Sequence, residues 1–214
     1  MTMQAHPEFP YRLYLVISEE ACGDKPMLEV AERAIKGGVD LIQLREKQLP
    51  EHIFLERAQR LKDLSSSYGI PLIINDNPMI ASKVRADGIH VGNHDIKPMT
   101  LRQQEFFKRK LIGHSIEYLQ QLDQEHVAVS DYLGISPVFK TNTKTDTVTA
   151  WGLDGMSKIR QLTDKPLVAI GNINIHNARA VLQAGADCLA VVSAICAAED
   201  PQKAAHALKN QIVS

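Results

Sequence analysis

Cysteine is scarce in this chain of 214 residues, which contains three. Cys22, Cys188 and Cys196 lack the close spacing of metal ligands, and their odd number argues against a disulfide scaffold. Few cysteines without pairing are typical of a reducing compartment. Cys188 lies in an apolar run and Cys196 beside alanines, so we interpret both as small buried side chains rather than nucleophiles.

Long apolar runs are absent as well, and no uninterrupted segment is long enough to cross a bilayer. The first ten residues are polar, contain two prolines and have no basic stretch followed by an apolar one, so we do not expect a secretory signal. The sequence therefore predicts a cytoplasmic protein without a membrane partner. It also predicts a loose N-terminal arm over residues 1–10, followed by one domain over residues 11–214.

A strong excess of charge of either sign is missing, since 24 Lys and Arg residues meet 25 Asp and Glu residues. A formal net charge of -1 gives no general attraction to nucleic acid or to an anionic membrane, so any anion site must be local. The contents of 44% hydrophobic and 23% charged residues are ordinary for a globular protein. The chain is long enough to bury a full core.

What the chain does contain is a regular alternation of short apolar runs and longer segments of helical periodicity. The expected strands cover residues 13–18, 41–45, 72–76, 88–91, 111–115, 132–136, 167–171 and 188–193. The expected helices include residues 27–36, 51–68, 153–162, 175–184 and 201–212. Asn174 and Asp200 are expected to cap the last two helices.

Eight strands alternating with helices, without a break in composition, predict an α/β protein with a single (β/α)8 TIM barrel. An open doubly wound sheet is the competing architecture, but no glycine-rich dinucleotide turn follows the first strand. Three similar phrases precede strands, and we expect them to be turns on the face of the barrel opposite the active site. They are Gly37-Gly38-Val39-Asp40, Arg85-Ala86-Asp87-Gly88 and Ala184-Gly185-Ala186-Asp187.

Polar clusters follow the apolar runs, where the C-terminal tips of parallel strands share one site. In the first cluster Gln43, Arg45 and Lys47 are two residues apart, so in extended backbone they point the same way. An amide, a guanidinium and an ammonium aimed together suit a phosphorylated ligand. A solvated strand end would look similar.

Asn75-Asp76 and Asp95 form the second cluster. Two carboxylates from neighbouring strand tips could share one Mg²⁺, which takes few carboxylates together with phosphate oxygens and water. Alternatively, both aspartates cap the helices that follow. Zinc at His90 and His94 is disfavoured because this spacing converges on a helix, whereas residues 88–91 have a strand pattern. We expect His90 in the barrel wall and His94 exposed.

Two further regions have the composition of anion sites. Thr141-Asn142-Thr143-Lys144 offers hydroxyl and backbone donors followed by a cation, within a stretch from Lys140 to Trp151 that is long enough for a lid. Gly171-Asn172 and Val192-Ser193 end the last two strands, the usual place of a phosphate cradle in barrels. Ser115 ends the fifth strand, where it could hydrogen-bond a substituent of an aromatic ring.

The phrases in this order resemble the thiamine-phosphate synthase family, and the resemblance runs from Tyr11 almost to the end of the chain. The matching phrases are Gln43-Leu44-Arg45-Glu46-Lys47, Ile74-Asn75-Asp76, residues 86–92 with Asp95, Pro137-Val138-Phe139 with residues 141–144, and Val191-Val192-Ser193-Ala194-Ile195. The family joins a hydroxymethylpyrimidine diphosphate to a thiazole phosphate and releases pyrophosphate, with Mg²⁺, by dissociative loss of the leaving group.

The resemblance also implies roles for individual residues. It places the pyrimidine diphosphate on Gln43, Leu44, Arg45, Glu46, Lys47, Asn75, Ser115 and Lys144. It places the thiazole phosphate on Thr141, Asn142, Thr143, Gly171, Val192 and Ser193, and Mg²⁺ on Asp76 and Asp95. Arg45, Lys47 and Lys144 would be the catalytic residues that neutralise the leaving pyrophosphate. Two phosphorylated small molecules are the implied partners, with a homodimer left open.

The chain departs from the family pattern at several positions. Asn77 stands where Arg is common, Asn172 where a second Gly is common, and Glu117 where His is frequent. Asn77 and Asn172 could weaken substrate binding. Two alternatives therefore remain: a related thiazole tautomerase, which would want that His, and a non-catalytic barrel that binds a phosphorylated metabolite.

Overall fold

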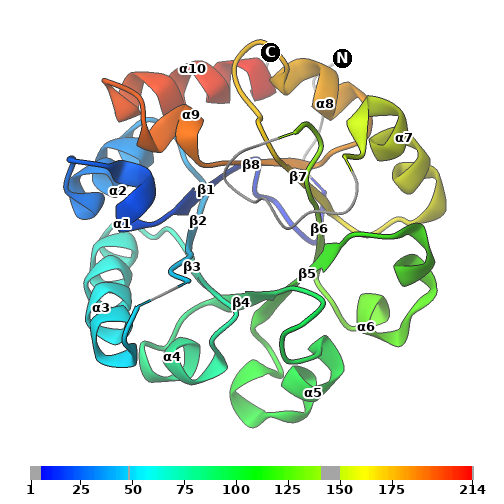
Figure 1. Ribbon diagram of the computed structural model, residues 1–214, viewed down its shortest axis with the longest axis horizontal. Helices are drawn as coiled ribbons and strands as arrows, with labels where there is room; N and C mark the ends of the chain where they lie inside the picture. The colour runs from blue at the N-terminus through cyan, green and yellow to red at the C-terminus, as the bar shows by residue number, and fades with distance from the viewer. Residues whose placement is uncertain (1–5, 48, 141–149, 214) are drawn as a thin grey trace.

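A closed barrel of eight parallel strands forms the centre of the protein, with its strands hydrogen-bonded in chain order (Figure 1). The computed structural model describes residues 6–47, 49–140 and 150–213. The strands are β1 (Leu13–Ile17), β2 (Leu41–Leu44), β3 (Leu72–Asn75), β4 (Gly88–Val91), β5 (Leu111–Ile116), β6 (Tyr132–Ile135), β7 (Leu167–Ile170) and β8 (Cys188–Val191). β1 pairs with β8 and closes the ring. The predicted (β/α)8 barrel is confirmed, and all eight strands begin where expected, with β5 one residue longer than its expected segment.

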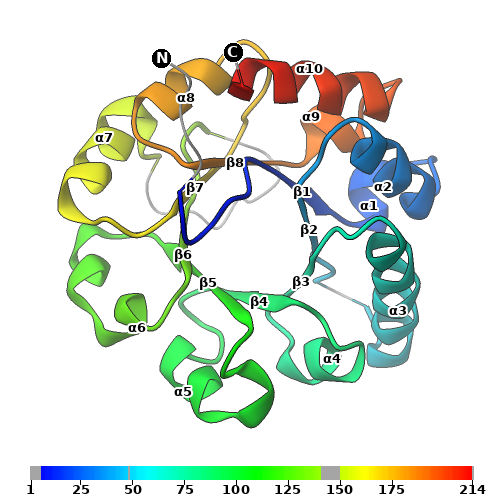
Figure 2. The same ribbon diagram turned by 180° about the vertical axis from the view of Figure 1, so that it is seen from behind.

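Helices surround the barrel on all sides (Figures 1 and 2). They are α1 (Glu19–Cys22), α2 (Met27–Lys36), α3 (Glu51–Ser67), α4 (Pro78–Lys83), α5 (Pro98–Gln103), α6 (Glu125–Ala128), α7 (Gly152–Leu162), α8 (Ala178–Gln183), α9 (Ser193–Cys196) and α10 (Pro201–Val213). Two 3₁₀ turns, η1 (Glu105–Phe107) and η2 (Leu119–Asp123), flank β5. Within the described residues, none of the helices could span a membrane.

Helix starts agree with the sequence except at α8. Asp200 caps α10 as expected, since its Oδ1 accepts hydrogen bonds from the backbone N–H groups of Gln202 and Lys203. The expected start of α8 at residue 175 is wrong. Asn174 instead closes a short turn by accepting from the N–H of His176, and the helix begins three residues later, at Ala178. A short polar side chain that bonds its own backbone competes with helix formation in this way.

Alternate side chains along each strand belong to two different apolar regions, one outside the barrel and one inside it. The outward-facing side chains, such as Leu15, Ile42 and Ile74, pack under the helices in the larger core cluster. Tyr14, Val16, Ile73 and Tyr132 belong to a second cluster, which fills the barrel interior. This separation follows from the two-residue period of a strand, which sends successive side chains to opposite faces.

The N-terminal segment closes one opening of the barrel. Phe9 is completely buried in the interior cluster, with its ring centroid 4.8 Å from that of Tyr132 and 4.9 Å from that of Tyr11. Figure 2 shows this segment crossing the opening. The expectation of a loose arm through residue 10 is therefore wrong for the described residues 6–10. Burial of an aromatic side chain offsets part of the entropy that ordering a short segment costs.

Aspartates at the starts of four alternate strands fasten the N-terminal ends of the strands together. Asp40, Asp87, Asp131 and Asp187 each precede an even-numbered strand. Each accepts a hydrogen bond from a backbone N–H near the start of the preceding odd-numbered strand, from Leu13, Leu72, Ile112 and Leu167 respectively. Each also pairs with a cation, in the same order Lys209, Lys62, Arg102 and Arg160. The three phrases singled out in the sequence supply three of these aspartates, and their expected place away from the strand tips is confirmed.

Candidate active site

Side chains at the end of β2 point in two directions. Some face the barrel mouth, where the strands end, and the others face the surrounding helices. Gln43 points into the barrel, because its Nε2 donates to the interior Tyr14 at 2.8 Å. Leu44 is fully buried in the outer core. Glu46 accepts from Arg57 at 3.0 Å and from the backbone N–H of Glu19 at 3.1 Å. Contacts of Leu44 or Glu46 with a ligand at the mouth would therefore have to come from backbone atoms.

Asp76 sits at the tip of β3 in a left-handed conformation, with φ of 62°. Its backbone N–H continues the pairing with β4 by donating to the carbonyl of His90 at 2.9 Å. Burial, followed by the neighbouring Asp95, raises the pKa of the Asp76 carboxyl to about 7, while Lys47 and Arg45 act in the opposite direction. The two carboxyls share a hydrogen bond, so they lie close together as the sequence predicts.

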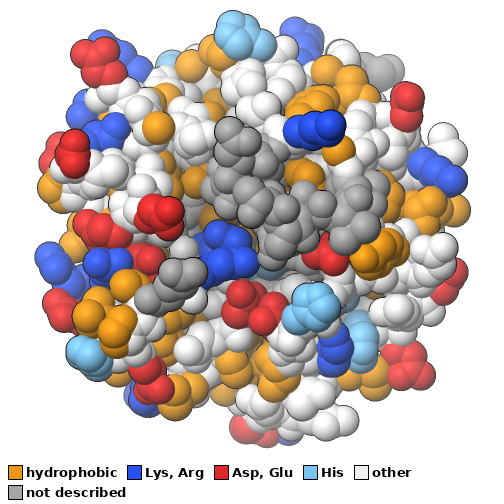
Figure 3. Space-filling model, viewed as in Figure 1, with side chains coloured by type: hydrophobic (Ala, Val, Ile, Leu, Met, Phe, Trp, Pro, Cys, Tyr) orange, Lys and Arg blue, Asp and Glu red, His pale blue; other side chains and the backbone are white. Residues whose placement is uncertain are grey.

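Asp95 reaches this position through a tight loop after β4. Its Oδ2 accepts from the backbone N–H of Gly92 at 2.8 Å, which fixes the carboxylate next to the strand tip. A carboxyl whose proton affinity is raised by a neighbouring carboxylate marks a site for positive charge. Figure 3 shows basic and acidic side chains next to each other near the centre of one face of the molecule.

The donor set of Asp76 and Asp95 fits Mg²⁺. This ion takes one or two carboxylates and completes its shell with substrate phosphates and water. The described residues contain no group of three or more His, Cys, Asp or Glu side chains placed to hold a metal. His90 lies on β4 with its two ring nitrogens within hydrogen-bonding distance of Tyr132 and Ser115.

The two aspartates do not cap the helices that follow them. The N-cap of α4 is Asn77, whose Oδ1 accepts from the N–H of Ile80 at 3.0 Å, and the N-cap of α5 is Lys97, without a side-chain bond. The helix-capping interpretation of Asp76 and Asp95 is therefore wrong. Asn77, the departure from the family pattern, has a structural task of its own.

Gly171 and Asn172 end β7 in left-handed backbone, with φ of 114° and 51°. A Cβ atom on Gly171 would lie 2.6 Å from that of Pro137, so the close approach of the β6 end requires glycine there. Asparagine tolerates the left-handed conformation better than most residues. Asn172 therefore keeps the backbone shape that a second glycine would have, and its carbonyl accepts from Asn174 and Asn177.

The remaining predicted residues divide between described and undescribed parts of the chain. Asn75 is buried at the end of β3, Val192 is half-buried and Ser193 is exposed at the start of α9. Thr141, Asn142, Thr143 and Lys144 lie outside the described residues, as does most of the expected lid. His94 is exposed, as expected.

A chain of hydrogen bonds inside the barrel joins two of the predicted residues. Gln43 contacts Tyr14, the hydroxyl of Tyr14 lies 3.0 Å from that of Tyr132, and Tyr132 lies 3.1 Å from Nδ1 of His90. Nε2 of His90 then lies 2.9 Å from the hydroxyl of Ser115. Sequence reasoning missed Tyr14 and Tyr132 and placed His90 only in the wall. Successive side chains of a strand face opposite ways. Counting in steps of two from Gln43 on β2 and from Gly88 on β4 could therefore have indicated which side chains face inward.

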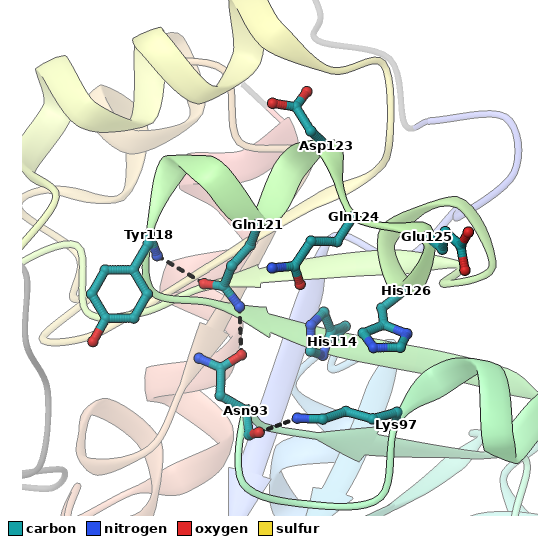
Figure 4. Close-up of a pocket in the computed structure, with 9 residues that line it drawn as sticks. All are labelled: Asn93, Lys97, His114, Tyr118, Gln121, Asp123, Gln124, Glu125 and His126. Atoms are coloured by element: carbon teal, nitrogen blue, oxygen red, sulfur yellow. Dashed lines mark hydrogen bonds between the residues drawn. The ribbon is translucent and has the colours of Figure 1, made fainter.

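A hollow of about 630 Å³ lies beside the mouth, between the loops after β4 and β5 (Figure 4). It contains His114, which alternates with the inward-facing Ser115 and so points toward the helices. Burial lowers the pKa of His114 to about 4. The amide of Gln121 ties the rim together by bonding Asn93 and the backbone N–H of Tyr118. The lining residues are Asn93, Lys97, His114, Tyr118, Gln121, Asp123, Gln124, Glu125 and His126.

The fold and the site define a class before any comparison with other proteins. A closed (β/α)8 barrel that gathers cations and paired carboxyls at its strand tips is an enzyme architecture suited to phosphorylated substrates. Solved structures with the same fold include a 3-hexulose-6-phosphate synthase, with a TM-score of 0.68 and 19% identity over 94% of this chain and 99% of that chain. At this identity the likeness concerns the fold alone.

Closer relatives identify the family. The family described as "Thiamine monophosphate synthase" matches residues 13–195. A thiamine-phosphate synthase of Albidiferax ferrireducens is 47% identical over 94% of this chain and 91% of its own length. One from Vibrio campbellii is 42% identical over 92% of this chain and 96% of its length. The solved thiamine phosphate pyrophosphorylase of Pyrococcus furiosus has a TM-score of 0.84 and 32% identity, covering 94% of this chain and 95% of that chain.

The chain therefore belongs to the thiamine monophosphate synthase family, and it is a transferase of thiamine biosynthesis. The resemblance drawn from the sequence motifs is confirmed. Both asparagine departures lie where the local backbone accommodates them.

Proposed function

We propose that this protein joins 4-amino-2-methyl-5-hydroxymethylpyrimidine diphosphate to 4-methyl-5-(2-phosphoethyl)thiazole, or to its carboxylate form, and releases thiamine phosphate and pyrophosphate. The reaction requires Mg²⁺. Family membership supports the reaction type. The observation that carries the site assignment is the pair of adjoining carboxyls, Asp76 and Asp95, with Arg45 and Lys47 acting on the same group.

Loss of pyrophosphate before attack by the thiazole nitrogen needs no nucleophilic side chain. It needs positive charge around the departing group and a partner held in line. Arg45 and Lys47 supply fixed charge at the tip of β2, and Lys144 adds a third cation in the proposal. Asp76 and Asp95 would hold a magnesium ion, which supplies further positive charge toward the diphosphate oxygens.

The monophosphate of the thiazole has its proposed site on the other side of the mouth. Backbone N–H groups beside Gly171, together with Val192 and Ser193, would hold it, and the family resemblance adds Thr141, Asn142 and Thr143 to this site. The left-handed backbone at Gly171 and Asn172 supports this role, since such turns point successive N–H groups toward one anion.

The two-substrate assay tests the proposal. Purified protein should release pyrophosphate and form thiamine phosphate with both substrates and Mg²⁺, and with EDTA the rate should fall at least about a hundredfold. Isomerisation of the thiazole without pyrophosphate would favour the tautomerase alternative. Binding of either substrate without turnover would favour the non-catalytic barrel.

A substitution at Lys144 tests its proposed task separately. Lys144→Ala should lower kcat about a hundredfold or more, because a cation that stabilises leaving-group charge acts in the transition state. The KM for the thiazole phosphate should change much less. An unchanged kcat would show that Lys144 does not assist the departure of pyrophosphate.

A further inference from the structure

Five side chains from five strands form one continuous hydrogen-bonded chain across the barrel interior. It runs from Gln43 on β2 through Tyr14 on β1, Tyr132 on β6 and His90 on β4 to Ser115 on β5. Gln43, Tyr14, Tyr132 and Ser115 are all buried. The two ends of the chain belong to strands that are three apart in the ring. Both ends are predicted pyrimidine-binding residues, whereas the three middle members have had no role so far.

The barrel wall is shaped around this chain. A Cβ atom on Gly113 would lie 2.2 Å from the ring of Tyr132 and 2.4 Å from Nδ1 of His90. A Cβ atom on Gly134 would lie 2.8 Å from the His90 ring. The rings of His90 and Tyr132 are stacked, with centroids 5.5 Å apart. Glycine on two adjacent strands therefore provides the space in which the middle of the chain is held in one geometry.

Counting hydrogens gives the chain a direction. Gln43 donates to Tyr14, and Tyr132 is then the neighbour in the chain that can accept the single hydroxyl hydrogen of Tyr14. Tyr132 then donates to Nδ1 of His90, and an uncharged imidazole that accepts at Nδ1 carries its hydrogen on Nε2. Nε2–H donates to the oxygen of Ser115, which leaves the Ser115 hydrogen for a partner outside the chain. Burial raises the pKa of both phenols, which therefore keep the hydrogens that this order needs.

The order sets what Ser115 offers to a ligand and holds the amide of Gln43 in one orientation. Gln43 has spent one of its two N–H groups on Tyr14 and keeps its carbonyl oxygen, an acceptor, together with its second N–H. Ser115 offers a hydroxyl hydrogen as a donor. Reversing the links through Tyr132 and His90 would make Tyr14 accept twice and leave its own hydroxyl hydrogen without a partner in the chain, because each hydroxyl has one hydrogen and the neutral imidazole has one N–H. The sense of Ser115 is thus coupled to the bond between Gln43 and Tyr14, although these residues lie on different strands.

We propose that Tyr14, Tyr132 and His90 are positioning residues that hold the amide of Gln43 in one orientation and set the hydrogen-bonding sense of Ser115, and so select an aminopyrimidine over the corresponding oxopyrimidine. An exocyclic amine donates to the carbonyl oxygen of Gln43 and a ring nitrogen accepts from Ser115. An oxopyrimidine presents a ring N–H to Ser115, which would leave the hydroxyl hydrogen of Ser115 without an acceptor. This inference rests on the proposed function, since it concerns the pyrimidine substrate of that reaction.

The test compares kcat/KM for the amino substrate with that for its 4-oxo counterpart, both as diphosphates. The intrinsic reactivities of the two compounds differ, but that difference is the same for every variant and cancels in the comparison. Tyr132→Phe removes only the hydroxyl, leaves Nδ1 of His90 without its donor and allows either tautomer. The ratio of the two kcat/KM values should fall about tenfold, the worth of one hydrogen bond of this kind.

Tyr14→Phe should lower the same ratio by a similar factor, because it releases the amide of Gln43 and lets the links from Tyr132 to Ser115 run in either direction. The double variant should lose about as much as either single variant rather than the product, since residues of one network are not additive. Tyr11→Phe is the matched control, because Tyr11 packs against the same interior cluster without belonging to the chain. It should leave the ratio unchanged.

The outcomes separate the two levels of the argument. If the wild-type protein does not release pyrophosphate from the amino substrate, the proposed function fails. If it does, but Tyr14→Phe and Tyr132→Phe slow both substrates equally, the hydroxyls only support the fold and the inference is wrong. A wild-type preference for the oxo substrate would also overturn it, because the chain would then run in the opposite sense.

Discussion

Single residues at the barrel mouth carry most of the chemistry. Asp76 combines left-handed backbone, partial burial and a carboxyl neighbour, and its pKa is raised to about 7. In the absence of a metal ion, the Asp76 carboxyl therefore keeps its proton at pH values at which an isolated aspartate has already lost it. A cation that binds this pair must therefore displace a proton over the physiological range.

This linkage predicts how binding of Mg²⁺ alone depends on pH. The acid form competes with the ion below the raised pKa, so the affinity should rise about tenfold per pH unit toward pH 7 and level off above it. Isothermal titration calorimetry between pH 5.5 and 8.5 measures the dissociation constant. Asp95→Asn removes the neighbouring charge and should move the curve to lower pH as well as weaken binding. A dissociation constant independent of pH in the wild-type protein would contradict the assignment.

Asn172 gives a second prediction at this scale. Its φ of 51° is costly for a residue with an ordinary side chain. Asn172→Ala should lower the free energy of unfolding by about 1–2 kcal/mol, whereas Asn172→Gly should cost much less. Urea titration followed by circular dichroism measures both. If the two variants lose equal stability, the side-chain contacts of Asn172 matter more than its backbone conformation.

At the scale of the elements, the aspartates before the even-numbered strands hold the barrel together far from the active site. Asp87 accepts from the backbone N–H of Leu72 at 2.9 Å and from Lys62 at 2.6 Å. Because every second strand has the same arrangement, each aspartate joins two strands and one helix. These aspartates stabilise the fold and lie away from the active site, so substitutions there should leave the catalytic rate of the folded protein unchanged.

Asp87→Ala should therefore lower the free energy of unfolding by about 2–3 kcal/mol, since it leaves a backbone donor and an ammonium group without their acceptor. Residual folded protein should keep the kcat of the wild type. Asp63→Ala is the matched control, because Asp63 accepts a hydrogen bond from Gln59 on the exposed face of α3. Its effect should stay within about 0.5 kcal/mol. Equal losses in both variants would mean that the strand-joining bonds add little.

At the scale of the whole molecule, buried groups outside the mouth contribute to the free energy of unfolding. His114 lies on β5 with its side chain toward the helices. Burial lowers its pKa to about 4, below the value of about 6.5 for an exposed histidine. The unfolded chain therefore takes up the proton first as the pH falls. The stability from this group is fully present above pH 6.5 and is lost progressively down to pH 4.

The size of this loss is up to about 3 kcal/mol. Urea titrations at pH 7.5, 6, 5 and 4 should show a steeper fall in the wild-type protein than in His114→Gln. His94→Gln, at an exposed position in the neighbouring loop, should behave as the wild type. Parallel curves for the wild type and His114→Gln would show that His114 takes up its proton equally easily in both states.

Closure of the barrel by Phe9 is the second property of the whole molecule. Phe9→Ala should lower the free energy of unfolding by about 3–5 kcal/mol, the usual cost of emptying a fully buried aromatic site. Phe106→Ala, which removes a half-buried ring at the surface, should cost clearly less. Thermal and urea unfolding measure both variants. Similar losses would mean that the N-terminal segment can be removed from the barrel without consequence.

Much of this protein could be predicted from local sequence pattern. Runs such as residues 72–76 and 167–171 gave the strands, and the residues that follow them gave the polar tips. The family motifs identified the enzyme class, which the comparisons confirm. The predicted start of α8 was wrong, because the short turn at Asn174 depends on contacts that periodicity does not record. The expectation of a loose segment was wrong for residues 6–10 for the same reason, since it missed the burial of Phe9.

The sequence by itself determined the strand order, the face on which each strand residue lies and the residues available at the mouth. These follow from the two-residue period of strands and from short connections between consecutive elements. Only the tertiary structure decided that Tyr14 meets Tyr132, 118 positions away, and that this contact continues through His90 to Ser115. The same holds for the raised pKa of Asp76. Both depend on distances and burial across a closed barrel, which arise when remote strands are brought together.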